Sequence, residues 1–150
     1  MVTATFSGTF DGGGNTLTFN YTATGDNAAP FAYITGATIK NLRVAGTITT
    51  SKKFAAGIVA ISNGGTLNIT NCLFDGKLLG TTTTSCGGIV GWHNSNSTLN
   101  ISKSLFAPAE VTVQGGAIFA RNSATSLTNC YYTTNPHNPG GRNFTDGTKI

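Results

Sequence analysis

The sequence predicts an all-β protein, a right-handed parallel β-helix (β-solenoid) of about four coils with 28–32 residues per coil. Two repeated phrases predict it. The first recurs at spacings of 30, 32 and 26 residues and begins at Ile39, Ile69, Ile101 and Leu127. The second is out of phase, recurs at spacings of 28, 31 and 29 residues, and begins at Pro30, Ile58, Ile89 and Ile118. Two repeated phrases with nearly the same period indicate a chain that returns to the same place in every coil.

Composition excludes a helical solenoid. The chain contains 20 Gly, is rich in threonine and asparagine, and has only 9% charged residues. Helical repeats need alanine, leucine, glutamate and lysine at a period of 3.6 residues, and no window supplies that pattern. Short apolar runs alternate instead with Asn, Gly and Ser clusters, which is typical of strands and turns.

Each repeat contains about three such runs, which we expect to form one coil. In the second coil the expected strands are 57–61, 66–74 and 76–80. Side chains alternate between the two faces of a strand, so Ile69 is expected inside the coil and Thr70 outside it. Stacking then predicts an interior column of Ile39, Ile69, Ile101 and Leu127, beside an outward column of Lys40, Thr70, Ser102 and Thr128.

The repeat sets the expected domain boundaries. Residues 1–135 are predicted to form the β-helix, in which residues 1–28 make an N-terminal coil or cap. Residues 136–150 contain Pro136, Pro139 and a Gly-Gly pair, which prevent a regular strand. We expect them to form an irregular C-terminal cap or a linker.

Charge and hydropathy bear on the kind of partner. The formal net charge is +4, but the basic residues are scattered, which is too dilute for a nucleic-acid-binding stripe. No run of eighteen apolar residues is present, so we expect no membrane insertion by this segment. We also expect that residues 1–3 carry no secretion signal, because no basic and apolar leader occurs there.

Three cysteines, an odd number, argue against a disulfide framework. Cys72 and Cys130 occupy one ladder position two coils apart, about 9.6 Å, and a disulfide needs Cα atoms within about 7 Å. Both are expected to be buried core residues. Cys86 lies near a corner, where its thiol could be partly exposed.

The chain resembles the bacterial GLUG-motif repeats, short β-helix units of large surface-anchored or secreted proteins, over about residues 6–132. The matching phrases are Phe6–Gly12, Ala37–Leu42, Gly57–Ala60, Gly88–Gly91, Asn71-Cys72 and Asn129-Cys130. Ala117 replaces the motif glycine in the last coil, and Lys103-Ser104 replaces Asn-Cys in the third. The resemblance implies a parallel β-helix that serves as a scaffold or an adhesive stalk.

An enzymatic function is disfavoured by the acidic residues. Polysaccharide lyases and hydrolases on β-helices need clustered carboxylates or bound calcium. The chain has only five acids, Asp11, Asp26, Asp75, Glu110 and Asp146. Asp75 and Glu110 might meet on adjacent coils, but Glu110 aligns with Lys77, so an ion pair is the simpler account. We therefore expect no catalytic residues, no metal site and no cofactor.

Two binding surfaces remain as alternatives. Trp92, the only tryptophan, lies beside His93, and its column contains Tyr33; these three side chains could stack on and hydrogen-bond a sugar ring. The simpler interpretation is that Trp92 covers the edge of the core. The threonine runs at 47–50 and 81–84 resemble the flat arrays of ice-binding β-solenoids, but Lys77 and Glu110 would break such an array.

The sequence thus predicts a non-catalytic module of a bacterial cell-surface or secreted protein, a structural spacer or an adhesive face located outside the cell. Its expected partners are neighbouring domains of a larger polypeptide and surface or host glycans, and not nucleic acid. A carbohydrate-binding module is the main alternative, and a polysaccharide-degrading enzyme or an ice-binding protein is a weaker one.

Overall fold

The computed structural model describes residues 2–81, 86–113, 118–122, 124–133 and 147–150. Within these ranges every element is a strand, and neighbouring strands pair in parallel. The larger sheet comprises β1 (Val2–Asp11), β2 (Thr16–Thr18), β4 (Phe31–Ala45), β6 (Val59–Ser62), β7 (Gly65–Phe74), β9 (Val90–His93), β10 (Ser97–Ser102), β11 (Leu105–Phe106), β13 (Ser126–Thr128), β14 (Tyr131–Tyr132) and β15 (Thr148–Lys149). The smaller sheet comprises β3 (Tyr21–Thr22), β5 (Thr47–Thr50), β8 (Lys77–Gly80) and β12 (Glu110–Val111).

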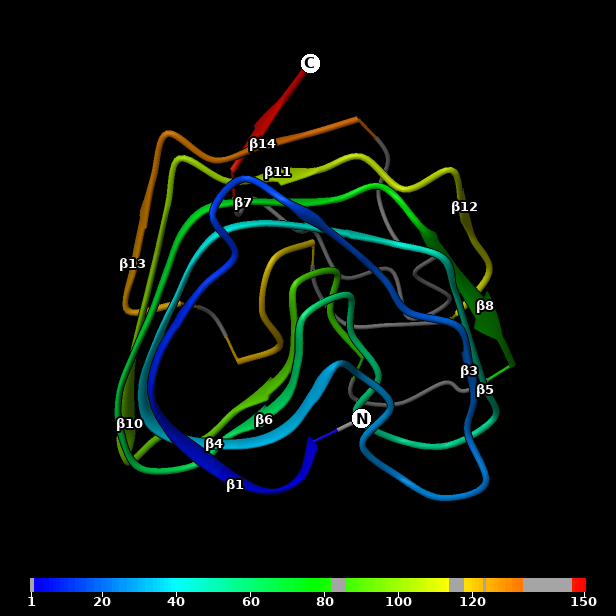
Figure 1. The fold of residues 1–150 in the computed structure, drawn as a ribbon, viewed down its shortest axis with the longest axis horizontal. Coiled ribbons are helices and arrows are strands. Elements are labelled where there is room, and N and C mark those ends of the chain that lie inside the picture. The colour runs from blue at the N-terminus through cyan, green and yellow to red at the C-terminus, as the bar shows by residue number, and fades with distance from the viewer. Residues whose placement is uncertain (1, 82–85, 114–117, 123, 134–146) are drawn as a thin grey trace.

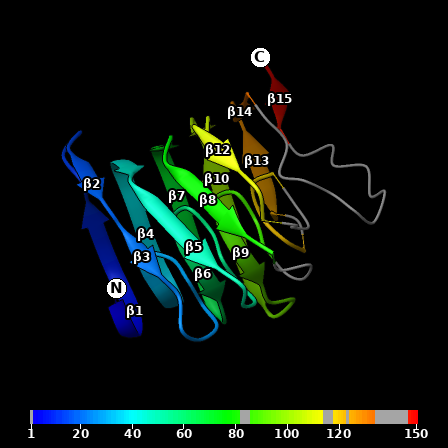
Figure 2. The same cartoon turned by 90° about the vertical axis from the view of Figure 1, so that its right-hand side faces the viewer.

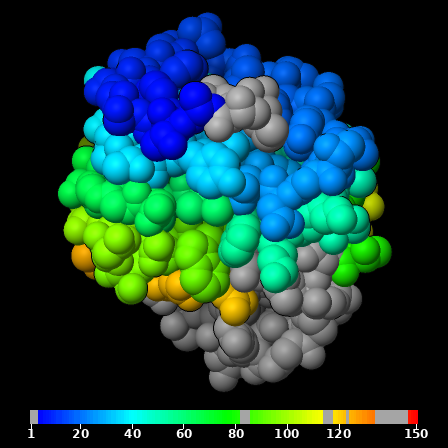
Figure 3. Space-filling view, turned by 90° about the horizontal axis from the view of Figure 1, so that it is seen from below, coloured from blue at the N-terminus to red at the C-terminus, as the bar shows by residue number. Residues whose placement is uncertain are grey.

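The strands wind into a β-solenoid of about four turns, which confirms the predicted fold class. Figure 1 looks along the axis of the winding, and Figure 2 shows successive strands side by side as layers. Seen from below, the turns form successive bands in chain order (Figure 3). Across the described residues, no helix is long and apolar enough to cross a membrane.

The register of the first repeated phrase is confirmed. Ile39 on β4 pairs with Ile69 on β7, Ile69 pairs with Ile101 on β10, and Ile101 pairs with Leu127 on β13. The three isoleucines are at most 1% exposed, whereas Leu127 is partly buried. In the second coil, β6, β7 and β8 begin or end one or two residues from the expected bounds.

Each turn bends at a residue with left-handed backbone conformation. The third position of the repeated phrase adopts φ of 53°, 53°, 51° and 53° at Asn41, Asn71, Lys103 and Asn129. Asparagine tolerates this region better than most residues, because its short polar side chain bonds locally. The conserved spacing of the phrase therefore fixes a column of corners as well as a column of core residues.

Aromatic rings fill the interior beside these corners. Phe74 and Phe106 are stacked, with ring centroids 5.9 Å apart and planes 11° apart. Gly57 and Gly88 pack directly on them, since a Cβ on Gly57 would lie 2.5 Å from the Phe74 ring and one on Gly88 would lie 2.8 Å from Phe106. Ile58 and Ile89 thus each follow a glycine because an aromatic ring from the other side of the same turn occupies the space of a side chain.

Two details differ from expectation. Val90 pairs with Ala120, whereas the spacing of the second phrase aligns Val90 with Phe119. Cys86 is only 1% exposed, so the idea of a partly exposed thiol is wrong: the segment before β9 folds into the solenoid interior rather than over its surface. Three features of the sequence lie outside the described residues: the second threonine run from residue 82 on, Ala117, and residues 136–146.

Candidate functional site

Tyr33 and Trp92 share one outer face of the solenoid. Tyr33 on β4 pairs with Ile61 on β6, and Ile61 pairs with Trp92 on β9. Tyr33 is 39% exposed, and Trp92 is partly buried. Because one strand separates them, the two rings lie about two strand spacings apart, roughly 9.6 Å. The sequence therefore placed these two aromatic residues correctly in one column.

Each ring also has a contact within the protein. The ring of Phe54 meets Trp92 edge to face, with centroids 5.6 Å apart and planes 65° apart. Phe54 itself has φ of 62°, an uncommon conformation for a bulky residue. Asn27 donates from Nδ2 to the Tyr33 hydroxyl at 2.5 Å. Trp92 is thus partly covered by the loop that precedes β6, which leaves less of the indole free for a ligand.

His93 lies on the opposite face of β9 from Trp92. It pairs with Ser62, which pairs with Ile34, and this column points into the interior. His93 is 5% exposed, and burial lowers the pKa of its imidazole. Its Nδ1 and the Oγ of Ser62 have no hydrogen-bond partner in the described part of the chain. The structure therefore does not bring His93 to the face where Tyr33 and Trp92 lie.

The described carboxylates all bond to the neighbouring turn. Four of the five acids are in the described ranges, and each accepts a hydrogen bond or ion pair from a residue 27 to 33 positions away. The pairs are Lys40 Nζ with Asp11 Oδ2 at 3.3 Å, Lys53 N–H with Asp26 Oδ1 at 3.0 Å, Arg43 Nη2 with Asp75 Oδ2 at 2.6 Å, and Lys77 Nζ with Glu110 Oε2 at 3.1 Å. The predicted pairing of Glu110 with Lys77 is confirmed.

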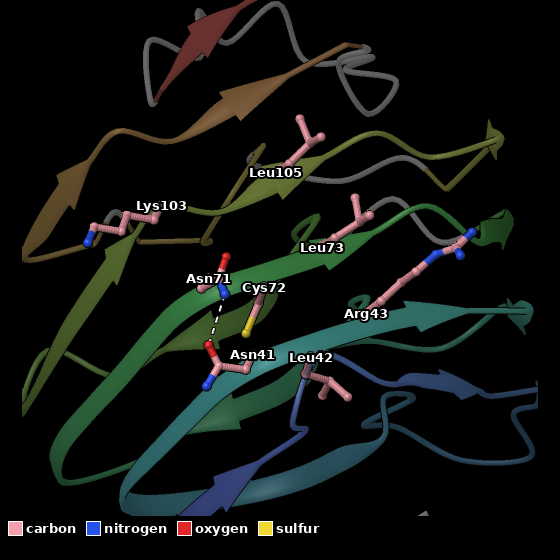
Figure 4. Close-up of a pocket in the computed structure, with 9 residues that line it drawn as sticks. Asn41, Leu42, Arg43, Asn71, Cys72, Leu73, Lys103 and Leu105 are labelled. Carbon is pink, nitrogen blue, oxygen red and sulfur yellow. Dashed lines mark hydrogen bonds between the residues drawn. The ribbon is translucent and has the colours of Figure 1, made fainter.

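An amide ladder runs along the corners. Asn71 donates from Nδ2 to Asn41 Oδ1 at 2.8 Å (Figure 4). Asn41 in turn donates from Nδ2 to Asp11 Oδ1 at 3.0 Å. The Asn41 amide, the Gly13 N–H and the Lys40 ammonium lower the pKa of the Asp11 carboxyl. At the third corner, Lys103 replaces the asparagine and ends the ladder. No described carboxylate lies within ion-pair distance of Lys103.

A shallow groove follows this ladder. One hollow of about 250 Å³ lies between the corner column and the outward leucines Leu73 and Leu105, which project from their strands in Figure 4. A second hollow of about 500 Å³ shares Lys103 and Leu105 with the first and extends to Tyr131, which is 41% exposed. The groove thus offers amides, the Lys103 ammonium, the Arg43 guanidinium, an apolar strip and one aromatic ring. Groups of these kinds are suited to hydrogen bonding and stacking.

The thiols and the possible metal ligands do not add a reactive centre. Cys72, Cys86 and Cys130 are all buried, and burial raises the pKa of the Cys72 thiol to about 11. A thiol with so high a pKa is a poor nucleophile. Among the described residues, no three His, Cys, Asp or Glu side chains are grouped so that they could hold a metal ion.

The sequence analysis missed the groove and the amide ladder. The signal was present, because the corner asparagines recur at the third position of the repeated phrase and an outward column of Leu73, Leu105 and Tyr131 follows two residues later. Comparison with known proteins returns no match to a family model, a curated protein or a solved structure.

Proposed function

We propose that this chain is a non-catalytic module of a bacterial cell-surface or secreted protein, in which the solenoid serves as a structural spacer or an adhesive face. One observation carries the proposal: every described carboxylate contacts the adjacent turn. A general acid or a metal ligand needs a carboxylate directed into a site, but these carboxylates join one turn to the next. Contacts of this kind stabilise the stacking of the turns, as a structural spacer requires.

The GLUG-repeat resemblance is part of the proposal. It is supported by the packing of the motif glycines, because Gly57 and Gly88 each face an aromatic ring from the other side of the same turn. A larger residue at either position would collide with that ring, so the glycine belongs to the fold and not to a ligand site. Proteins with such repeats are surface or secreted, and an extracellular location follows from the same proposal.

Carbohydrate binding is the second candidate, and a specific observation favours it. Tyr33 and Trp92 share one outer face, and aromatic rings on a flat face are suited to stack on sugar rings. An ice-binding function is less well supported, since Thr47 pairs with Lys77 and Lys77 with Glu110, which interrupts the threonine column.

The test is a combined cleavage and binding assay with the purified 150-residue chain. Polysaccharides from plants, algae and host tissues are incubated with the protein, with and without calcium. The expected result is no release of reducing ends or unsaturated products. Product release would overturn the non-catalytic proposal.

Binding to the same polysaccharides is measured with two matched variants. If the Tyr33 face binds glycans, Trp92→Ala abolishes binding, and Tyr131→Ala, which removes an exposed aromatic ring in the groove, leaves it unchanged. If Tyr131→Ala abolishes binding and Trp92→Ala leaves it unchanged, the adhesive face is the groove and not the Tyr33 face. Melting temperatures of both variants within a few degrees of the wild type serve as the folding control.

A further inference from the structure

One corner of the solenoid carries a lysine where the repeat otherwise has asparagine. Lys103 occupies the same corner position as Asn41, Asn71 and Asn129, and its backbone has φ of 51°, in the left-handed region. Asparagine adopts this conformation more readily than lysine, because its short polar side chain can hydrogen-bond locally. The lysine also ends the amide ladder, since an ammonium group cannot accept a hydrogen bond from the next amide. The chain therefore gives up stability at this corner, and backbone conformations of this kind cluster at functional sites.

The ladder ends beside Lys103 with unused hydrogen-bonding groups. Asn71 donates from Nδ2 to Asn41 Oδ1, and its own Oδ1 points away from Asn41 (Figure 4). In the described part of the chain, no protein group donates to that oxygen, and neither the Lys103 ammonium nor the Asn129 amide has a protein partner. All three side chains are exposed. A carbonyl oxygen, an ammonium group and an amide are therefore available to a ligand along one column of corners.

An apolar and aromatic strip lies two residues after these corners. Leu73, Leu105 and Tyr131 are in register on β7, β11 and β14, and Tyr131 is 41% exposed. Neighbouring strands are about 4.8 Å apart and successive residues about 3.3 Å, so the Cα atoms of Lys103 and Tyr131 lie roughly 8 Å apart. Both residues line the hollow of about 500 Å³ together with Asn129. The hollow thus combines a ring that can stack on the apolar face of a sugar with polar groups for its hydroxyl and acidic substituents.

The charge in the groove indicates the class of sugar. Arg43 also lines the groove, but Asp75 accepts hydrogen bonds from its Nε at 2.9 Å and from its Nη2 at 2.6 Å. Among the described residues of the groove, Lys103 is thus the one cation without a carboxylate partner. A single uncompensated ammonium group matches a ligand with one negative charge at the point of contact. A densely sulfated chain would need several such cations to offset its charge.

We propose that the groove along Lys103 and Tyr131 binds an acidic polysaccharide whose charged groups are carboxylates, a chain of uronic acid residues. The proposal rests on the proposed adhesive function, to which it adds a ligand class and a face other than the Tyr33 face. The uronate carboxylate accepts hydrogen bonds from the Lys103 ammonium and the Asn129 amide. A sugar hydroxyl donates to Asn71 Oδ1, and a sugar ring stacks on the exposed tyrosine.

Affinity electrophoresis of the 150-residue chain in gels that contain polygalacturonate tests the proposal. The wild type should be retarded by polygalacturonate and not by its fully methyl-esterified form, which keeps the polymer backbone and loses the charge. Lys103→Asn removes the ammonium group and restores the asparagine of the repeat, so it should weaken binding by about tenfold or more while the melting temperature rises. Lys52→Asn, which removes the same charge from an exposed residue outside the groove, should bind like the wild type.

The aromatic contact is tested with two substitutions of Tyr131. Tyr131→Ala removes the ring and should weaken binding to polygalacturonate, whereas Tyr131→Phe keeps the stacking face and should retain it. Melting temperatures of both variants within a few degrees of the wild type serve as the folding control. Equal binding by Tyr131→Ala and the wild type would contradict the stacking contact.

Four further results would overturn the proposal. They are an absence of retardation of the wild type, equal retardation by the esterified polymer, equal losses in Lys103→Asn and Lys52→Asn, and binding that Trp92→Ala abolishes but Lys103→Asn does not. Stronger retardation by dextran sulfate that depends on Lys103 would overturn the assignment of a carboxylate. All of these outcomes differ from product release in the cleavage assay, which would overturn the non-catalytic function itself.

Discussion

The turn that contains β6, β7 and β8 and the turn that contains β1, β2 and β3 use the same strand arrangement but bury their side chains to different degrees. In the central turn, Ile69 and Phe74 are at most 1% exposed, because another turn lies on each side. In the first turn, Phe10 is 36% exposed, and among the described strands β1 pairs with β4 alone.

This difference shows that a residue of a solenoid takes part of its burial from each neighbouring turn. The contribution of a residue to stability therefore depends on the number of turns that contact it as well as on its own hydrophobicity. We expect the first turn to open more readily than the centre of the molecule, since local stability follows the density of buried contacts.

The largest expected effect is a charge in the centre of the core. Ile69→Asp places a carboxylate between Ile39 and Ile101, where it has no partner, and should cost several kcal/mol and unfold the domain. Thr70→Asp, one residue along, points outward and should change the free energy of unfolding by less than about 1 kcal/mol. Thermal melts of both variants measure the difference. Equal shifts would contradict the assignment of inner and outer faces.

Truncation of matched aromatic residues tests the central and first turns directly. Phe74→Ala removes a fully buried ring that stacks on Phe106, and should cost about 3–5 kcal/mol. Phe10→Ala removes a ring that solvent already reaches, and should cost less than about half as much. Urea denaturation gives both free energies. If Phe10→Ala costs as much as Phe74→Ala, the first turn is not weaker than the centre.

The smallest expected effect is a pH dependence that arises from His93. Its pKa is lowered by burial in the folded chain, so the unfolded chain binds the proton first as pH falls. The contribution of His93 to the free energy of unfolding is fully present above the unfolded pKa of about 6.5 and declines as pH falls below it. Urea denaturation between about pH 8 and about pH 5 measures this slope, and His93→Leu should flatten it. An equal slope in both proteins would show that His93 is not the group responsible.

Much of the fold could be predicted because a parallel stack repeats one pattern. The isoleucine column and the pairing of Lys77 with Glu110 follow from a common spacing, since residues one period apart lie on adjacent strands. The same argument placed Tyr33 and Trp92 on one face. The alternation along a strand also separates His93 from Trp92, because adjacent residues of a strand face opposite sides.

The repeat period of the sequence predicts the winding of the chain and the order of its columns. The folded structure adds which parts of that pattern are covered: the burial of Cys86, the contact of Phe54 with Trp92, the groove beside Lys103 and the exposure of Phe10. The physical reason is that a period fixes which strands are adjacent. The paths of the connecting segments and the presence of a turn on each side depend on contacts that the period does not encode.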